Sequence, residues 1–138
     1  GIENNKIYNN VYNSNEISKL KLLSVALKNL ELIIDKKTAL MHICQNDLIK
    51  NNYKKGDSEG IVNYGLTLSG IQFSVIFIED ENEKNKFKIS FRSKEDFPCN
   101  EFASNFFDGG GHLNAAGGIF TGNLNSAIEY FKKSLNEF

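Results

Sequence analysis

The sequence predicts an α+β domain in which a mixed β-sheet is flanked by helices. Three patterns support this fold class. Residues 72–79 carry apolar side chains on both faces of a strand, which is typical of a strand at the centre of a sheet. Residues 87–92 alternate apolar and polar side chains, which indicates a strand with one polar face. Residues 125–135 place apolar side chains at helical spacing and predict a final amphipathic helix.

The first predicted element is a helix that begins at Asn13 or Ser14. Either side chain can cap a helix, and Glu16 favours its first turn. Apolar residues recur at steps of three and four and predict one apolar face: Leu20, Leu23, Leu27, Leu30 and Ile34. Both a helix that connects two domains and a plain packing helix fit this pattern. We expect residues 1–13 to be the end of an interdomain linker and residues 14–138 to form one domain.

The next segments predict a strand and two helices. Residues 39–44 are apolar and indicate a buried strand, and residues 45–52 indicate a short helix. Asp57 and Ser58 are expected to cap a helix that starts at residues 59–64.

The last third of the chain predicts a hairpin, a helix and a strand before the final helix. The polar residues 80–85 indicate the hairpin loop, and residues 100–107 indicate the helix. The glycine run that follows predicts a loop, which leads to a strand near residues 118–121.

The composition excludes several classes of protein. The formal net charge is −1, whereas duplex-DNA binders carry a basic excess, so any nucleic-acid ligand is expected to be short. Cys44 and Cys99 form no C-x-x-C pair, and with His42 and His112 they offer no zinc-ligand spacing. We therefore expect reduced thiols and a cytoplasmic protein. No apolar run approaches the roughly 20 residues of a membrane span.

The most informative segment runs from Asp108 to Gly118. Gly109 to Gly111 let another molecule approach the backbone without a Cβ in the way, and His112 follows directly. A helix end with a tight turn would need only one of these glycines. Backbone N–H groups beside an imidazole suit an anionic ligand, so the segment predicts a binding site.

Arg92 is the second candidate for binding an anion. A guanidinium group matches a phosphate with two parallel hydrogen bonds, and Ser93 can add a hydroxyl. A solvated arginine on a strand face fits the same pattern. His42 lies within an apolar strand and is expected to be a core residue. Glu59 fits either a helix start or a polar site.

The segment Gly109-Gly110-Gly111-His112-Leu113-Asn114-Ala115-Ala116-Gly117 resembles the signature of the DHHA1 domain, the C-terminal half of DHH-family phosphoesterases. Residues 19–23, residues 56–63 and the segment from Phe91 to Ala103 resemble the branch of nanoRNases (oligoribonucleases) and pAp phosphatases. The resemblance covers residues 12–138.

This resemblance implies that catalysis and substrate binding belong to separate domains. A separate N-terminal DHH domain would bind manganese ions and hydrolyse the substrate, a short oligoribonucleotide or pAp. The present chain begins at Gly1 and would be the substrate-binding half, with no catalytic residue and no metal ligand of its own. Expected partners are the substrate, the DHH domain and, in one arrangement, a second copy of the chain; no membrane is expected. The residues expected to contact the substrate are Arg92, Ser93, Gly109, Gly110, Gly111, His112, Asn114, Ala115 and Ala116.

Two other functions stay open. A similar domain occurs in cyclic-dinucleotide phosphodiesterases, which usually carry membrane and sensory segments upstream. A related domain at the end of alanyl-tRNA synthetases is a non-catalytic RNA-binding module. That relative tends to carry Arg at the position of His112, which counts against the second alternative.

Overall fold

A six-stranded mixed sheet forms the centre of the protein, in the strand order β1-β2-β3-β4-β6-β5. β2 and β3 are parallel, and all other neighbours are antiparallel. The computed structural model describes residues 17–138, so the expected linker at residues 1–13 and the helix cap at Asn13 or Ser14 lie outside the described residues. The elements are α2 (Ile17–Lys28), β1 (Glu31–Ile33), η2 (Ile34–Lys36), β2 (Thr38–Ile43), α3 (Gln45–Lys50), η3 (Ile61–Thr67), β3 (Phe73–Glu79), β4 (Lys86–Ser93), α4 (Cys99–Phe106), β5 (Gly110–His112), β6 (Ala115–Thr121) and α5 (Leu124–Glu137).

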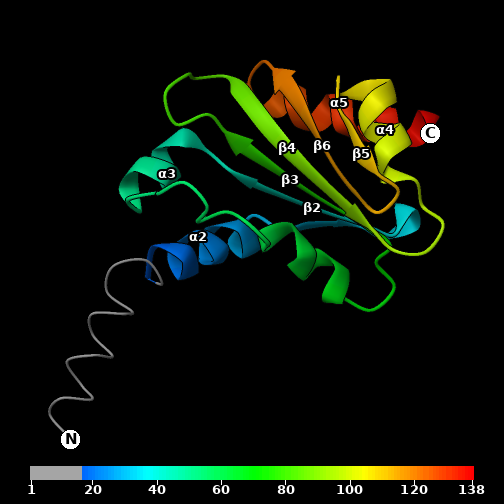
Figure 1. Ribbon diagram of the computed structural model, residues 1–138, viewed down its shortest axis with the longest axis horizontal. Coiled ribbons are helices and arrows are strands. Elements are labelled where there is room, and N and C mark those ends of the chain that lie inside the picture. The colour runs from blue at the N-terminus through cyan, green and yellow to red at the C-terminus, as the bar shows by residue number, and fades with distance from the viewer. Residues whose placement is uncertain (1–16) are drawn as a thin grey trace, which may run out of the picture.

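Helices cover both faces of the sheet, which confirms the predicted α+β fold class. Figure 1 shows α2 and α3 on one side of the strands and α4 and α5 on the other. Because successive side chains of a strand point to opposite faces, each strand contributes to two separate cores. β3 lies between β2 and β4, so the prediction that it is a central strand is confirmed.

The core under α4 and α5 is built from aromatic rings. Phe73 of β3 contacts Phe102 of α4 edge to face at 5.2 Å between ring centroids, and Phe77 contacts Phe131 of α5 in the same way at 5.9 Å. Edge-to-face pairs add about 0.5–1.5 kcal/mol each beyond the burial of their area. This core attaches the two C-terminal helices to the middle of the sheet.

The core on the other face lies under α2, α3 and η3. Leu22 of α2, Met41 of β2, Leu48 of α3 and Ile76 of β3 are each at most 1% exposed and pack together. The three elements cover β2 and β3 but leave β4, β6 and β5 more open on this face, where Lys88, Ile119 and His112 are exposed. The open part of the sheet is where the candidate site lies.

The first helix is shorter than predicted, and only Leu23 and Leu30 of its predicted apolar face pack against the core. α2 ends at Lys28, and Glu31–Ile33 instead pairs with β2 as an antiparallel strand. Leu20 is 61% exposed, whereas the buried residues of α2 are Leu22 and Ala26. The strand pairing of residues 31–33 overrides the helical spacing, which ran on to Leu30 and Ile34.

The predicted helix cap at Asp57 and Ser58 is also wrong. η3 begins at Ile61 after Gly60, which has φ 84°, and no side chain caps it. Asp57 is 5% exposed, and its Oδ2 accepts hydrogen bonds from the backbone N–H of Lys54 at 2.9 Å and from Oγ of Ser18 at 2.8 Å. Its carboxylate therefore connects this loop to α2.

The glycine run is a β-hairpin rather than a loop. β5 contains Gly110 to His112 and pairs with the first residues of β6. β6 begins at Ala115, three residues earlier than the strand predicted near residues 118–121. This hairpin extends the sheet beyond β4.

Candidate functional site

Arg92, Ala115 and His112 form one row across three strands. Arg92 of β4 pairs directly with Ala115 of β6, which pairs directly with His112 of β5. Directly paired residues present their side chains to the same face, and neighbouring strands lie about 4.8 Å apart, so the Cα atoms of Arg92 and His112 are roughly 10 Å apart. Ala115, which lies between these two longer side chains in the row, contributes only a methyl group. Figure 1 shows β4, β6 and β5 side by side in this part of the sheet.

A second row, two residues along the strands, carries almost no side-chain atoms. Ser90 of β4 pairs with Gly117 of β6, which pairs with Gly110 of β5. A Cβ on Gly110 would meet nothing within 4 Å, and a Cβ on Gly117 would meet only the carbonyl oxygen of Ile89 at 3.4 Å. We call Gly110 and Gly117 the glycine strip. A ligand can lie directly against the backbone there.

The other glycines of this segment are required by the fold. A Cβ on Gly109 would overlap the carbonyl oxygen of Gly117, and one on Gly111 would lie 2.6 Å from the carbonyl oxygen of Ala115. A Cβ on Gly118 would lie 2.8 Å from Cβ of Phe107. Only the glycine strip is thus free of a packing requirement. Gly117 was not among the predicted site residues, although its place two residues after Ala115 in a strand puts it on the same face.

Arg92 has a positive charge that no carboxylate neutralises within residues 17–138. Its side chain is half-buried, and Nη1 donates to the carbonyl oxygen of Phe91 at 2.8 Å and lies 3.4 Å from that of Ala116. These bonds hold one edge of the guanidinium group and leave its other donors available for an anion. Arg92 is also the only arginine among the chain's 16 Lys and Arg residues, a sequence signal that favours a role that lysine cannot fill.

Ser93 and Asn114 hold the β5–β6 turn in place. Ser93 is 6% exposed, and its hydroxyl donates to the carbonyl oxygen of Phe97 at 2.7 Å. The hydroxyl oxygen of Ser93 also accepts a hydrogen bond from Nδ2 of Asn114 at 2.9 Å. The backbone N–H of Cys99 adds a bond to the carbonyl oxygen of Leu113 at 2.9 Å. Both predicted residues lie beside the row, but their hydrogen bonds serve the turn; a contact of either with substrate stays a prediction.

The remaining predicted residues divide between the two faces. Ala115 lies in the row, whereas Ala116 is 7% exposed and packs into the aromatic core behind it. His42 pairs with Phe77 and so faces the opposite side from Arg92. It is half-buried, and burial lowers its pKa from 6.5. Glu59 is exposed in the loop before η3 and is not part of the row.

No metal-binding cluster exists in the described part of the chain. Within residues 17–138, no group of three or more His, Cys, Asp and Glu side chains could hold an ion. Burial raises the pKa of the Cys99 thiol, which also disfavours the thiolate that a metal would need. None of the helices described is long and apolar enough to span a membrane.

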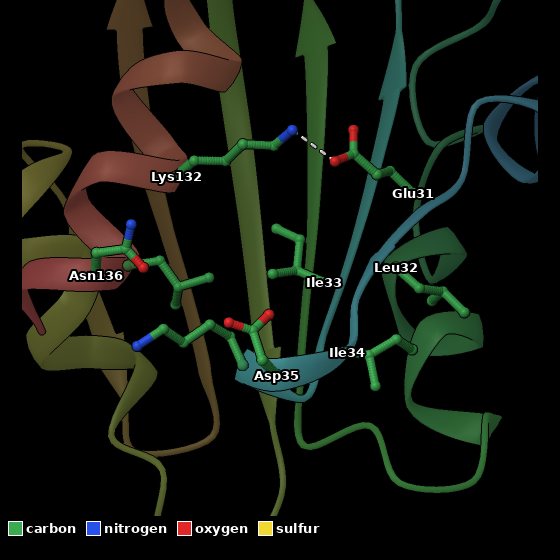
Figure 2. Close-up of a pocket in the computed structure, with 9 residues that line it drawn as sticks. Glu31, Leu32, Ile33, Ile34, Asp35, Lys132 and Asn136 are labelled. Atoms are coloured by element: carbon green, nitrogen blue, oxygen red, sulfur yellow. Dashed lines mark ion pairs between the residues drawn. The ribbon is translucent and has the colours of Figure 1, made fainter.

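A cavity of about 350 Å³ lies on the far side of the sheet, between the β1–η2 segment and α5. Figure 2 shows Lys132 of α5 reaching across its opening to Glu31 of β1, and the two charged groups are 2.6 Å apart. The cavity is also lined by Lys36 and by Asp35, so a cation and a carboxylate lie together there, whereas Arg92 has no carboxylate partner within residues 17–138.

The fold and the open face define a mixed-sheet α+β domain with its candidate site on the last three strands. Residues 35–138 match the family model of the DHHA1 domain. The chain therefore belongs to the DHHA1 domain family.

Solved structures share this fold. An exopolyphosphatase-related protein from Bacteroides fragilis is 40% identical over 97% of this chain, with a TM-score of 0.84. The pGpG-specific phosphodiesterase PggH from Vibrio cholerae is 12% identical over 89% of the chain, with a TM-score of 0.59, which shows the fold alone. The chain spans 38% and 39% of the lengths of these two proteins. No curated protein matches the chain.

Proposed function

We propose that this chain is the substrate-binding domain of a DHH-family phosphoesterase from the nanoRNase and pAp-phosphatase branch. Its substrate would be a short oligoribonucleotide or pAp. Membership of the DHHA1 family supports the class of enzyme. The observation that carries the proposal is the row in which Arg92 and His112 flank Ala115 beside the glycine strip.

The residues of the row suit a phosphorylated ligand. The donors of Arg92 that are not bound to the backbone can form two parallel hydrogen bonds with one phosphate. The exposed imidazole of His112 can donate to the same group from the other side, because Ala115 between them contributes only a methyl group. The glycine strip lets the sugar–phosphate chain lie against the sheet. A few directed donors suffice for a short ligand, in keeping with a net charge of −1.

Hydrolysis would require groups from outside the described residues. Manganese ions held by Asp and His residues of a DHH domain would supply Lewis-acid chemistry and an activated water. This chain would hold the substrate's phosphate and orient its ester toward that domain. We place the parent protein in the cytoplasm, where Cys44 and Cys99 would stay reduced.

The test is the kinetics of the full-length protein with pAp and with a short oligoadenylate. Arg92→Lys keeps the charge but loses the planar pair of donors, so KM should rise by about tenfold or more, the equivalent of at least ~1.4 kcal/mol. His112→Ala should raise KM or lower kcat. Lys94→Ala is the matched control, because Lys94 is exposed just beyond the end of β4.

Unchanged kinetics for both the Arg92 and the His112 variant would refute the proposal. Faster turnover of cyclic di-AMP than of the oligoadenylate would instead favour a cyclic-dinucleotide phosphodiesterase. Tight tRNA binding by the chain, without hydrolysis by its parent protein, would favour an RNA-binding module.

A further inference from the structure

A second cavity opens on the same face of the sheet as Arg92. It has a volume of about 350 Å³ and lies between the end of α3, the end of β3 and the first half of β4. We call it the Tyr53 cavity. Leu48, Tyr53 and Ile78 form the apolar part of its lining, and the polar part includes Lys55, Lys88 and Ser90.

The Tyr53 cavity is continuous with the candidate site. Ser90 lines the cavity and also begins the row that contains the glycine strip. Lys88, Ser90 and Arg92 alternate along β4, so their side chains share one face. Lys88 is four residues from Arg92, a separation of roughly 13 Å along the strand. A ligand held at Arg92 must therefore extend along β4 to enter the cavity.

The cavity joins an apolar wall to two cations. Tyr53 and Ile78 are half-buried, and Leu48 is 1% exposed, so together they offer an aromatic ring and aliphatic surface. Lys55 and Lys88 are exposed, and neither forms an ion pair with another of residues 17–138. A nucleobase next to its own phosphate has matching chemistry, because aromatic side chains stack on bases and lysines attract the phosphate.

The carboxylates at the cavity argue for a nucleoside rather than a bare phosphate. Both oxygens of Glu79 accept backbone hydrogen bonds, from Gln45 at 2.8 Å and from Asn85 at 2.7 Å. Oδ2 of Asp80 accepts two more, from Asn82 and Glu83. Glu81 is exposed at the rim, where a carboxylate repels phosphate but accepts hydrogen bonds from ribose hydroxyls or base amino groups.

We propose that the Tyr53 cavity binds the nucleoside of a second nucleotide, when the first is held at Arg92 and His112. This inference rests on the proposed function and narrows it to an oligoribonucleotide of two or more residues. A single nucleotide such as pAp has no second nucleoside to place in the cavity, so its KM should not depend on Tyr53.

The experiment compares KM for an oligoadenylate with KM for pAp in the full-length protein. Tyr53→Leu retains apolar packing and removes the ring, and Lys88→Ala removes a cation from an exposed position. Tyr53→Leu should raise the ratio of the two KM values by about tenfold, the size of one lost base–aromatic contact. Lys88→Ala should also raise this ratio, because the phosphate of the second nucleotide loses a cation. Tyr53→Phe should keep the ratio, because the ring remains. Lys84→Ala, on the β3–β4 turn outside the cavity, is the control.

An unchanged ratio in both Tyr53→Leu and Lys88→Ala would overturn the inference. If Arg92→Lys still raised KM for both substrates, the proposed function would survive that result. If neither Arg92→Lys nor His112→Ala changed the kinetics with either substrate, the proposed function itself would fail.

Discussion

A Cβ on Gly109 would overlap the carbonyl oxygen of Gly117 across the β5–β6 pair, whereas a Cβ on the adjacent Gly110 would meet open space. Two consecutive glycines therefore have different reasons to lack a side chain. The fold requires the first, and the second widens the surface beside Arg92 and His112.

Gly109→Ala and Gly110→Ala should separate these two reasons. Gly109→Ala should destabilise the domain by about 1–3 kcal/mol, because backbone must move to accept the methyl group. Gly110→Ala should leave stability equal or higher by up to about 1 kcal/mol, since alanine restricts the unfolded chain. Urea unfolding measures the stability of both variants. Calorimetric titration with pAp should show weaker binding for Gly110→Ala. Equal destabilisation by both variants would contradict this division.

Ala115→Leu should block the row without harming the fold. Ala115 is half-buried on the open face between Arg92 and His112, so a larger side chain would occupy the space proposed for the phosphate. We expect affinity for pAp to fall by at least about tenfold, which corresponds to ~1.4 kcal/mol. Thr121→Leu is the control, because it places a leucine on the same face of β6 at the exposed end of the strand. This variant should bind pAp with the affinity of the unchanged protein. If Ala115→Leu bound pAp with unchanged affinity, the phosphate would not lie between Arg92 and His112.

His42 should make the domain less stable in mild acid. Burial lowers its pKa from 6.5, so the unfolded chain binds a proton more readily than the folded one. The free energy of unfolding should therefore be highest above pH 6.5 and should decrease as the pH falls from 6.5 toward the lowered pKa of His42. Urea unfolding between about pH 7.5 and about pH 5.5 measures this slope. His42→Leu should flatten it, and an identical slope in that variant would assign the effect to another group.

The fold was predictable wherever a local pattern decides the structure. The two apolar faces of β3 and the alternation in β4 follow from residues next to one another in sequence. The segment after Lys28 was not predictable in this way, because Glu31–Ile33 forms a strand only by pairing with β2. The hairpin of β5 and β6 is similar, since glycine has a low intrinsic preference for strands and partner residues decide the outcome.

The sequence suggests candidate site residues, but it does not specify how they are arranged. Arg92 and His112 were expected from their chemistry, but their common row depends on the register of three strands. Alternation along β4 does indicate that Ser93 faces away from Arg92, a deduction available from the strand period alone. By the same rule, Ala116 faces the opposite side of the sheet from Ala115. The Tyr53 cavity depends on how the loop after α3 lies over the sheet, which no sequence pattern specifies.

The bonds from Asn114 to Ser93 and from Cys99 to Leu113 tie the tip of the β5–β6 hairpin to the end of β4 and the start of α4. These hydrogen bonds within the chain fix the conformation of the tip. The backbone of the tip therefore loses little conformational entropy when a ligand binds, so more of the interaction energy contributes to affinity. The hairpin should act as a preformed receptor that keeps the same backbone when filled and when empty.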